Sequence, residues 1–164
     1  MLHIAQAQKE GLHMEYKRIP LHEECPTPFD CIKKLISQNK GTQNSIMKSD
    51  LLKLAEANGI SVKGSDTKAA IFTALAEKMP LEAIAEKCNI GVSSRNIQQK
   101  FGVKNAEVKR MANKGLIRIT GKEKYCRFGT TFTANLYSIF DFYRLSCADV
   151  QAWLNQHSRP AHKR

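Results

Sequence analysis

Apolar residues recur at helical spacing in several separate stretches of the chain. The clearest stretch covers 97–111, where the apolar positions are Ile97, Phe101, Val103, Val108 and Met111. Gly102 stands at a point where a helix must end, and glycine tolerates the positive φ that a tight corner requires. Two short helices can pack across each other when their inward positions are apolar. The pattern therefore predicts a helix-turn-helix, with Asn105 as the cap of a second helix over 106–114.

Upstream of this unit the same periodicity predicts four more helices. They are expected from the cap Asp30 to about Asn39, from Ser49 or Asp50 to Asn58, from Lys68 to Lys78, and from Leu81 to Cys88. Residues 60–67 are expected to cross between the second and third helices in extended form. Met79-Pro80 ends the third helix, because proline cannot continue it.

Downstream of residue 114 the pattern favours strands. Leu116 to Ile119 is a short β-favouring run, Gly121-Lys122 predicts a turn, and 125–140 alternates loosely with a break at Gly129. We expect an antiparallel hairpin with Lys122 and Lys124 at its tip. A last helix opens at Ser146, with Asp149 completing an approximate capping box.

The aromatic residues near the carboxyl end have two interpretations. They could stack on the bases of a single-stranded nucleic acid. We favour a place in the core, because they are mixed with apolar residues rather than with cations. The residues concerned are Phe128, Phe132, Tyr137, Phe140, Phe142 and Tyr143.

The distribution of charge indicates a class of function, the binding of a polyanion. The chain of 164 residues carries 26 Lys and Arg against 15 Asp and Glu, a formal net charge of +11. Between Gly91 and Phe128 there are ten basic residues and two acidic ones, a net +8. Such clustering on a helix and a hairpin favours a polyanionic partner, since each phosphate that a protein neutralises releases condensed counterions.

Residues 81–145 resemble the winged helix-turn-helix family of DNA-binding proteins. The resemblance implies that the second helix enters the major groove while the hairpin lies along phosphates. The residues that would contact DNA are Arg95, Lys104, Asn105, Lys109, Arg110, Asn113, Lys114, Lys122, Lys124 and Arg127. Gln98 departs from the family pattern, which has a small residue there. A rival frame, with 81–90 as the first helix and 94–99 as the reading helix, puts Ala85 at that position, but it places Arg95 where an apolar residue should pack.

The preceding segment SDLLKLAEANGISVKGSDTKAAIFTALAEK resembles small SAP and helix-extended-loop-helix modules, including those at the front of the transcription terminator Rho. This resemblance implies phosphate contacts from the loop and from the start of the second helix. The residues concerned are Lys63, Gly64, Thr67 and Lys68. A helical hairpin that only supports its neighbour is the alternative.

Other chemistries have weak signals in this sequence. The five cysteines are odd in number and scattered, which argues for reduced thiols rather than disulfides or a metal site. We find no phosphate-binding glycine loop, nucleophile elbow or zinc-protease spacing, so we expect neither an enzyme nor a cofactor. The sequence also lacks an apolar run of bilayer length and a secretory leader, so we expect a cytoplasmic protein without a membrane partner.

Together these patterns predict a mainly α fold with a small β wing, of the α+β class. We expect an amino-terminal segment with one amphipathic helix (1–42), the helix-extended-loop-helix module (43–79), the winged helix-turn-helix (80–156) and a basic tail (157–164). The expected function is sequence-specific binding of double-stranded DNA by a small bacterial or phage-type regulator or accessory factor. The alternatives are a winged-helix module that binds or inhibits a nucleic-acid enzyme, and an RNA-binding protein. Pairing of two copies through the apolar stripe of the first helix stays open.

Overall fold

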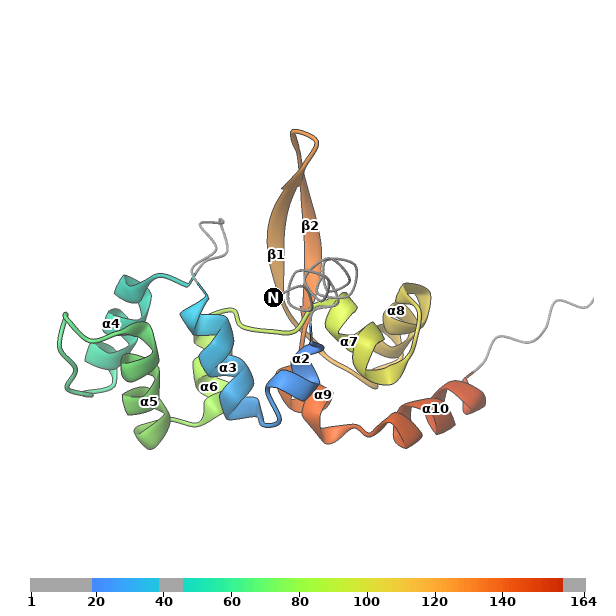
Figure 1. The fold of residues 1–164 in the computed structure, drawn as a ribbon, viewed down its shortest axis with the longest axis horizontal. Helices are drawn as coiled ribbons and strands as arrows, with labels where there is room; N and C mark the ends of the chain where they lie inside the picture. Colours follow the sequence, from blue (N-terminus) through green and yellow to red (C-terminus); the bar gives the residue numbers. More distant parts are fainter. Residues whose placement is uncertain (1–18, 39–45, 158–164) are drawn as a thin grey trace, which may run out of the picture.

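The computed structural model describes residues 19–38 and 46–157, and this part of the chain is mainly helical with one small sheet (Figure 1). The predicted α+β class is therefore confirmed. The helices of the described part are α2 (Leu21–Glu24), α3 (Pro28–Ser37), α4 (Lys48–Ala57), α5 (Lys68–Lys78), α6 (Leu81–Lys87), α7 (Ser94–Phe101), α8 (Asn105–Asn113), α9 (Ile139–Arg144) and α10 (Cys147–Gln156). The two strands are β1 (Ile119–Arg127) and β2 (Thr130–Tyr137).

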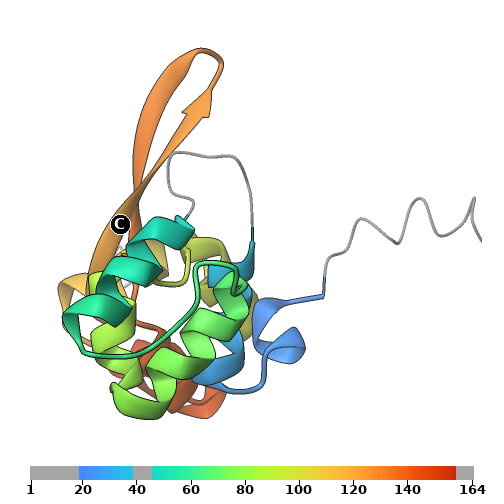
Figure 2. The ribbon, with the colours of Figure 1, turned by 90° about the vertical axis from the view of Figure 1, so that its left-hand side faces the viewer.

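The helices lie on both sides of the β1–β2 hairpin, which projects away from them (Figure 1). On one side, α3 packs against α5 and α6, and α5 also contacts α4. On the other side, α7 packs against α8 and α10, while α2 and α9 lie between the two groups below the base of the hairpin (Figure 1). Seen after a quarter turn, the hairpin still extends beyond every helix (Figure 2).

The helices of the first group begin at caps that the sequence only partly predicts. Thr27, not Asp30, caps α3: its hydroxyl accepts from the backbone N–H of Asp30 at 3.2 Å, and proline occupies the first helical position. The helix α4 begins at Lys48, slightly before the predicted start. Thr67 caps α5 by accepting from the Ala70 N–H at 3.1 Å, and α5 has the predicted bounds.

The helices α7 and α8 meet at the predicted corner. Gly102 adopts φ 65°, the left-handed conformation that glycine enters without steric cost. Before it, Ser93 and Asn96 form a capping box at the start of α7. The prediction for the next start is wrong by one residue: Lys104 holds the cap position of α8 and Asn105 is already helical, while the Glu107 side chain accepts from the Lys104 N–H at 2.9 Å.

The hairpin is longer than predicted and turns at a different place. The strands β1 and β2 pair antiparallel from Ile119↔Tyr137 to Arg127↔Thr130, so the turn holds only Phe128 and Gly129, with φ 53° and 75°. The turn predicted at Gly121-Lys122 is therefore wrong. Gly121 instead marks a register shift inside β1, since a glycine in a strand serves a bulge as readily as a turn.

A further correction concerns the end of the hairpin. The strand predicted to run to Phe140 stops at Tyr137, and Ile139–Arg144 forms α9. Ser138 starts this helix, because its hydroxyl accepts from the Asp141 N–H at 3.2 Å. The predicted last helix is confirmed: Ser146 and Asp149 form a capping box at the start of α10.

The base of the hairpin is fixed to the segment between α6 and α7. Val92 forms an isolated antiparallel bridge with Tyr137, and the two residues exchange backbone hydrogen bonds of 2.8 and 2.9 Å. The Asn89 side chain, on a backbone with φ 53°, donates to the Lys122 carbonyl at 3.0 Å. These bonds fix the direction of the β1–β2 hairpin, which projects as an arm, from its first residues.

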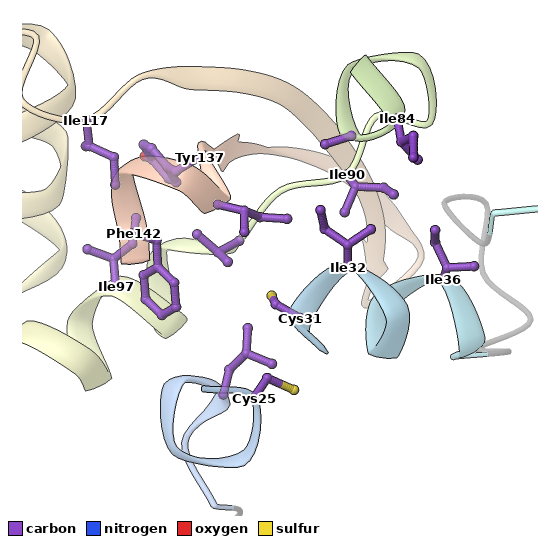
Figure 3. Packing of buried hydrophobic residues seen from close by; sticks show 14 of the residues in the cluster. Cys25, Cys31, Ile32, Ile36, Ile84, Ile90, Ile97, Ile117, Tyr137 and Phe142 are labelled. Atoms are coloured by element: carbon purple, nitrogen blue, oxygen red, sulfur yellow. The ribbon is translucent and has the colours of Figure 1, made fainter. Parts of the chain in front are cut away.

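Buried apolar side chains from both groups of helices form one cluster around the base of the hairpin (Figure 3). Ile32 and Ile84 come from the first group, Ile97 from α7, and Phe142 from α9. The predicted boundary at 79/80 does not interrupt this packing, because α6 contacts α3 and α5 while α3 contacts α9. The division into domains stays a prediction.

The expectation that all six aromatic residues lie in the core is wrong for two of them. Tyr137 and Phe142 are buried, and Phe140 and Tyr143 are partly buried against the same cluster. Phe128 and Phe132 lie on the projecting hairpin and remain 95% and 43% exposed. The error follows from the longer hairpin, which carries these two positions away from the helices.

Candidate nucleic-acid interface

The helix α8 presents a polar stripe to solvent. Asn105, Lys109 and Asn113 follow one another at intervals of four residues and are all exposed. Val108 and Met111, on the opposite face, are fully buried. Burial of one face thus fixes which side chains of α8 are available to a partner.

A polar chain of side chains joins α7 to the start of this stripe. Ser94 donates from its hydroxyl to Oδ1 of Asn105 at 2.6 Å, and Gln98 donates from Nε2 to the Ser94 hydroxyl at 3.0 Å. Gln98 is the residue that departs from the family pattern. Its side chain is half-buried, and its hydrogen bond to Ser94 connects it to Asn105 of α8.

Arg110 also lies on α8 but points toward α10. Its side chain is half-buried, and its guanidinium donates to the carbonyl of His157 at 3.3 Å. The His157 ring stacks on Trp153 with 4.2 Å between centroids. A contact of Arg110 with DNA stays a prediction, and the structure adds an intramolecular partner for the guanidinium.

Lys100 is one of the ten clustered cations, yet it is partly buried between α7 and α9. Its ammonium donates to the carbonyls of Phe142 and Leu145, the latter at 3.1 Å, and lies 4.9 Å from the centroid of the Phe142 ring. Burial lowers the pKa of Lys100 below its ordinary value. This lysine therefore serves the fold by satisfying carbonyls at the end of α9.

Arg118 is likewise engaged within the chain. Its backbone N–H and its Nε both donate to Oδ2 of Asp141, at 2.9 and 3.2 Å, and Arg144 donates to Oδ1 at 3.1 Å. Burial by itself would raise the pKa of Asp141, but these hydrogen bonds outweigh it and lower the pKa below its ordinary value. Asp141 is thus a carboxylate that ties α9 to the entry of the hairpin.

The hairpin has two chemically different faces. Because directly paired residues point to the same side of an antiparallel ribbon, Lys122, Lys124 and Cys126 share a face with their polar partners on β2, which are Asn135, Thr133 and Thr131. On the opposite face, Tyr125 stacks on Phe132 with 5.5 Å between ring centroids. Lys122 and Lys124 therefore lie along the side of the arm, not at its tip as predicted.

The remaining residues that were predicted to contact DNA lie at the surface of three elements. Arg95 is exposed in the first turn of α7, Lys104 and Lys114 are exposed at the two ends of α8, and Arg127 is exposed at the end of β1. The structure thus places the exposed candidate cations on α7, α8 and the hairpin. They are Arg95, Lys104, Lys109, Lys114, Lys122, Lys124 and Arg127.

The predicted phosphate-contacting loop between α4 and α5 uses its polar groups internally. The backbone N–H of Lys63 donates to the Asp66 carboxylate at 2.8 Å, and the Thr67 hydroxyl caps α5. Gly64 is open to solvent on its side-chain position, and Lys68 is half-buried. Because Asp66 brings a negative charge to this loop, the loop is a weaker candidate than α8 and the hairpin for binding phosphate.

Within 19–38 and 46–157 no group of three or more His, Cys, Asp and Glu side chains could hold a metal ion. Cys25 and Cys31 are buried, and burial raises the pKa of Cys31 to about 12. No helix in these ranges has the length and apolar character needed to cross a bilayer.

Two residues that the sequence did not assign to the DNA-binding site shape the candidate interface. Phe128 forms the tip of the arm, and Asn89 anchors its base. A break was predicted at Gly129, but the tip was predicted at Lys122 and Lys124, and the aromatic residues around Gly129 favoured a place in the core. Asn89 carried no signal, because its bond to the Lys122 carbonyl joins positions 33 residues apart.

Comparisons of the chain with protein-family models, curated proteins and solved structures found no match.

Proposed function

We propose that the chain is a winged-helix protein that binds double-stranded DNA. In this proposal α8 enters the major groove, with Lys109 and Asn113 toward base edges, and the β1–β2 hairpin is the wing that lies along the backbone. Lys122 and Lys124 supply phosphate contacts, which add affinity without reading sequence. Regulation of transcription by a small cytoplasmic protein of bacterial or phage type is the expected biological setting.

The single observation that carries the proposal is the order and pairing of the elements. The chain runs α6, the bridge residue Val92, α7, α8, β1 and β2. Val92 pairs with Tyr137 at the carboxyl end of β2. A winged helix has this order, with a short strand between its first two helices that joins the edge of the hairpin. In the proposed complex one duplex contacts both the exposed stripe of α8 and the hairpin.

Charge supports the same partner. Lys100 and Arg110 are half-buried and bonded within the fold, and Arg118 is exposed but paired with Asp141. The seven exposed candidate cations lie on α7, α8 and the hairpin. Exposed cations on adjacent elements produce the salt-dependent attraction that governs binding to DNA.

A salt titration with matched variants tests the proposal. The apparent affinity for a labelled mixed-sequence duplex should fall steeply as salt rises, and Lys122→Ala should reduce the logarithmic slope by about 0.9 because one phosphate contact is lost. Lys100→Met is the matched control: it also removes one positive charge, but from a buried site, so the slope should stay unchanged provided the variant melts as a folded protein.

Equal slopes for Lys122→Ala and the wild type, or no retention of duplex at low salt, would reject the proposal. A selection of bound duplexes from a random pool then tests sequence preference. A palindromic product would indicate a dimer, since the symmetry of a site mirrors the symmetry of the protein.

A second candidate is a winged-helix module that grips a protein partner. The exposed aromatic residues Tyr125, Phe128 and Phe132 on the hairpin favour it, because aromatic residues are enriched in protein interfaces. Binding that depends on these aromatic residues, with a shallow salt dependence and no retention of duplex, would support this candidate over DNA binding.

A further inference from the structure

The tip of the hairpin exposes one aromatic ring almost completely. Phe128 is 95% exposed, and it lies at the far end of an arm that stands clear of the helices in both views (Figures 1 and 2). The eight residues from Gly121 to Phe128 span about 25 Å in extended form, at roughly 3.3 Å per residue. The ring is therefore carried well beyond the helical surface.

The backbone at this tip is unfavourable for phenylalanine. Phe128 and Gly129 form a two-residue turn in which both φ angles are positive, 53° and 75°. Asparagine and glycine are preferred at such positions, and a bulky side chain with positive φ is strained. An aromatic residue held in a strained and solvated place points to a role outside the folded chain.

The surroundings of the ring indicate the chemistry of its partner. The guanidinium carbon of Arg127 lies 5.8 Å from the centroid of the Phe128 ring. Behind the tip, one face of the ribbon carries Lys122 and Lys124 among threonines and an asparagine. An apolar wedge flanked by cations suits a ligand that has stacked flat rings between two rows of phosphates.

We propose that Phe128 is a wedge that inserts between adjacent base pairs of duplex DNA, unstacks them and bends the helix. The inference rests on the proposed DNA binding and assigns the tip a separate action. With α8 in the major groove, the arm reaches the neighbouring minor groove, the side from which apolar wedges kink DNA toward the major groove. Flexible pyrimidine–purine steps are the preferred sites, because they unstack at the lowest cost.

The base of the arm suits this action. The Asn89 bond to the Lys122 carbonyl and the Val92–Tyr137 bridge hold the first residues of the ribbon to the segment before α7. A wedge must resist being pushed aside when it separates base pairs. The anchored base and the continuous pairing of β1 with β2 from Gly121 to Arg127 provide that resistance.

The test uses a short duplex that contains TA steps, carries 2-aminopurine in place of adenine at those steps, and has an energy-transfer pair at its ends. Emission of 2-aminopurine rises on unstacking, and energy transfer rises on bending. The wild-type chain should raise both signals. Phe128→Asn should raise neither, although its affinity changes by about tenfold or less, since the ring's insertion largely offsets the cost of unstacking.

Phe128→Asn is informative because asparagine suits the turn better than phenylalanine, so the hairpin stays folded and the variant melts no lower than the wild type. Phe128→Tyr, which keeps a ring, should restore both signals. If the wild type binds the duplex without either signal, or if Phe128→Asn distorts it equally, the wedge is rejected while DNA binding stands. If the wild type does not bind the duplex at low salt, the proposed function fails and the wedge fails with it.

Discussion

At the scale of single residues, Asp141 shows how one carboxylate can join a helix to the entry of the hairpin. It lies at the start of α9, accepts from Arg118 before β1, and accepts from Arg144 at the end of its own helix. Its side chain is only 7% exposed, so the charge would be costly without these partners. The two arginines are largely exposed, and screening by solvent reduces what the ion pairs add to the hydrogen bonds.

Asp141→Asn should lower the free energy of unfolding at neutral pH by about 1–3 kcal/mol, because hydrogen bonds to a charged acceptor are replaced by weaker ones. The folded pKa of Asp141 is lowered, so its stabilising contribution is present above the unfolded pKa of about 3.9 and is lost as pH falls through the folded value. The difference between variant and wild type should therefore shrink below about pH 4.

Urea denaturation across this pH range measures the effect. Glu56→Gln, at an exposed position near the end of α4, serves as the control and should leave stability within about 0.5 kcal/mol. A constant difference between Asp141→Asn and wild type at all pH values would contradict the ionic role.

At the scale of elements, the approach of β2 to the chain before α7 depends on a glycine. A Cβ at Gly91 would lie 2.8 Å from the Leu136 Cβ and 2.8 Å from the Tyr137 carbonyl oxygen. The second of these atoms belongs to the backbone and cannot move without disturbing the Val92–Tyr137 bridge. Gly91→Ala should therefore cost about 1–3 kcal/mol through overpacking.

Gly64→Ala provides the matched control for that substitution. No atom lies within 4 Å of a Cβ built at Gly64, so the change should be neutral or add up to about 1 kcal/mol by restricting the unfolded chain. Thermal unfolding of both variants makes the comparison. Equal melting temperatures would mean that β2 does not approach Gly91 as closely as described.

Most helices and the presence of an antiparallel hairpin were predictable from the sequence. The position of the hairpin's turn, the length of its strands and the helix α9 were not, because they depend on interactions between distant residues. Helix bounds follow from local periodicity, caps and breakers, as the exact match of Lys68–Lys78 illustrates. The turn was placed at Gly121-Lys122 because a glycine beside a lysine reads as a turn. Only the pairing with β2 shows that Gly121 follows an irregularity between Ile119 and Gly121 and lies inside the strand.

The candidate site was also predictable only in part: its exposed residues on α8 follow from the sequence, and the internal partners of its cations do not. The basic stripe of α8 follows from helical spacing around Val108 and Met111. The internal partners of Lys100 and Arg118 depend on residues of α9, more than 20 positions away in the sequence. Charge clustering therefore indicates the candidate region, and tertiary contacts decide which of its cations have partners within the fold.

At the scale of the whole molecule, the reactivity of the five cysteine thiols can be used to test how the elements pack. Cys126 and Cys147 are exposed, Cys88 is partly buried, and Cys25 and Cys31 are buried. Burial raises the pKa of Cys88 to about 11 and that of Cys31 to about 12, which further reduces their thiolate populations. We expect two thiols to react rapidly with a disulfide reagent at pH 8 and the others to react slowly or only after unfolding.

Mass spectrometry of the labelled chain identifies which cysteines react. Cys126→Ser and Cys147→Ser should each remove one rapid equivalent and leave the slow ones unchanged. Rapid reaction of Cys31 in the folded chain would contradict the packing of α3 against its neighbours.

The anchor at Asn89 has a consequence for how target sites would be chosen. If α8 and the arm contact one duplex, the separation between their two footprints is set by the hydrogen bond from Asn89 to the Lys122 carbonyl and by the Val92–Tyr137 bridge. Neither the Asn89 side chain nor the Val92–Tyr137 bridge needs to touch DNA. Substitution of Asn89 would then make the distance between the two footprints variable. The chain would tolerate sites of several lengths, while every contact with bases and phosphates stays available.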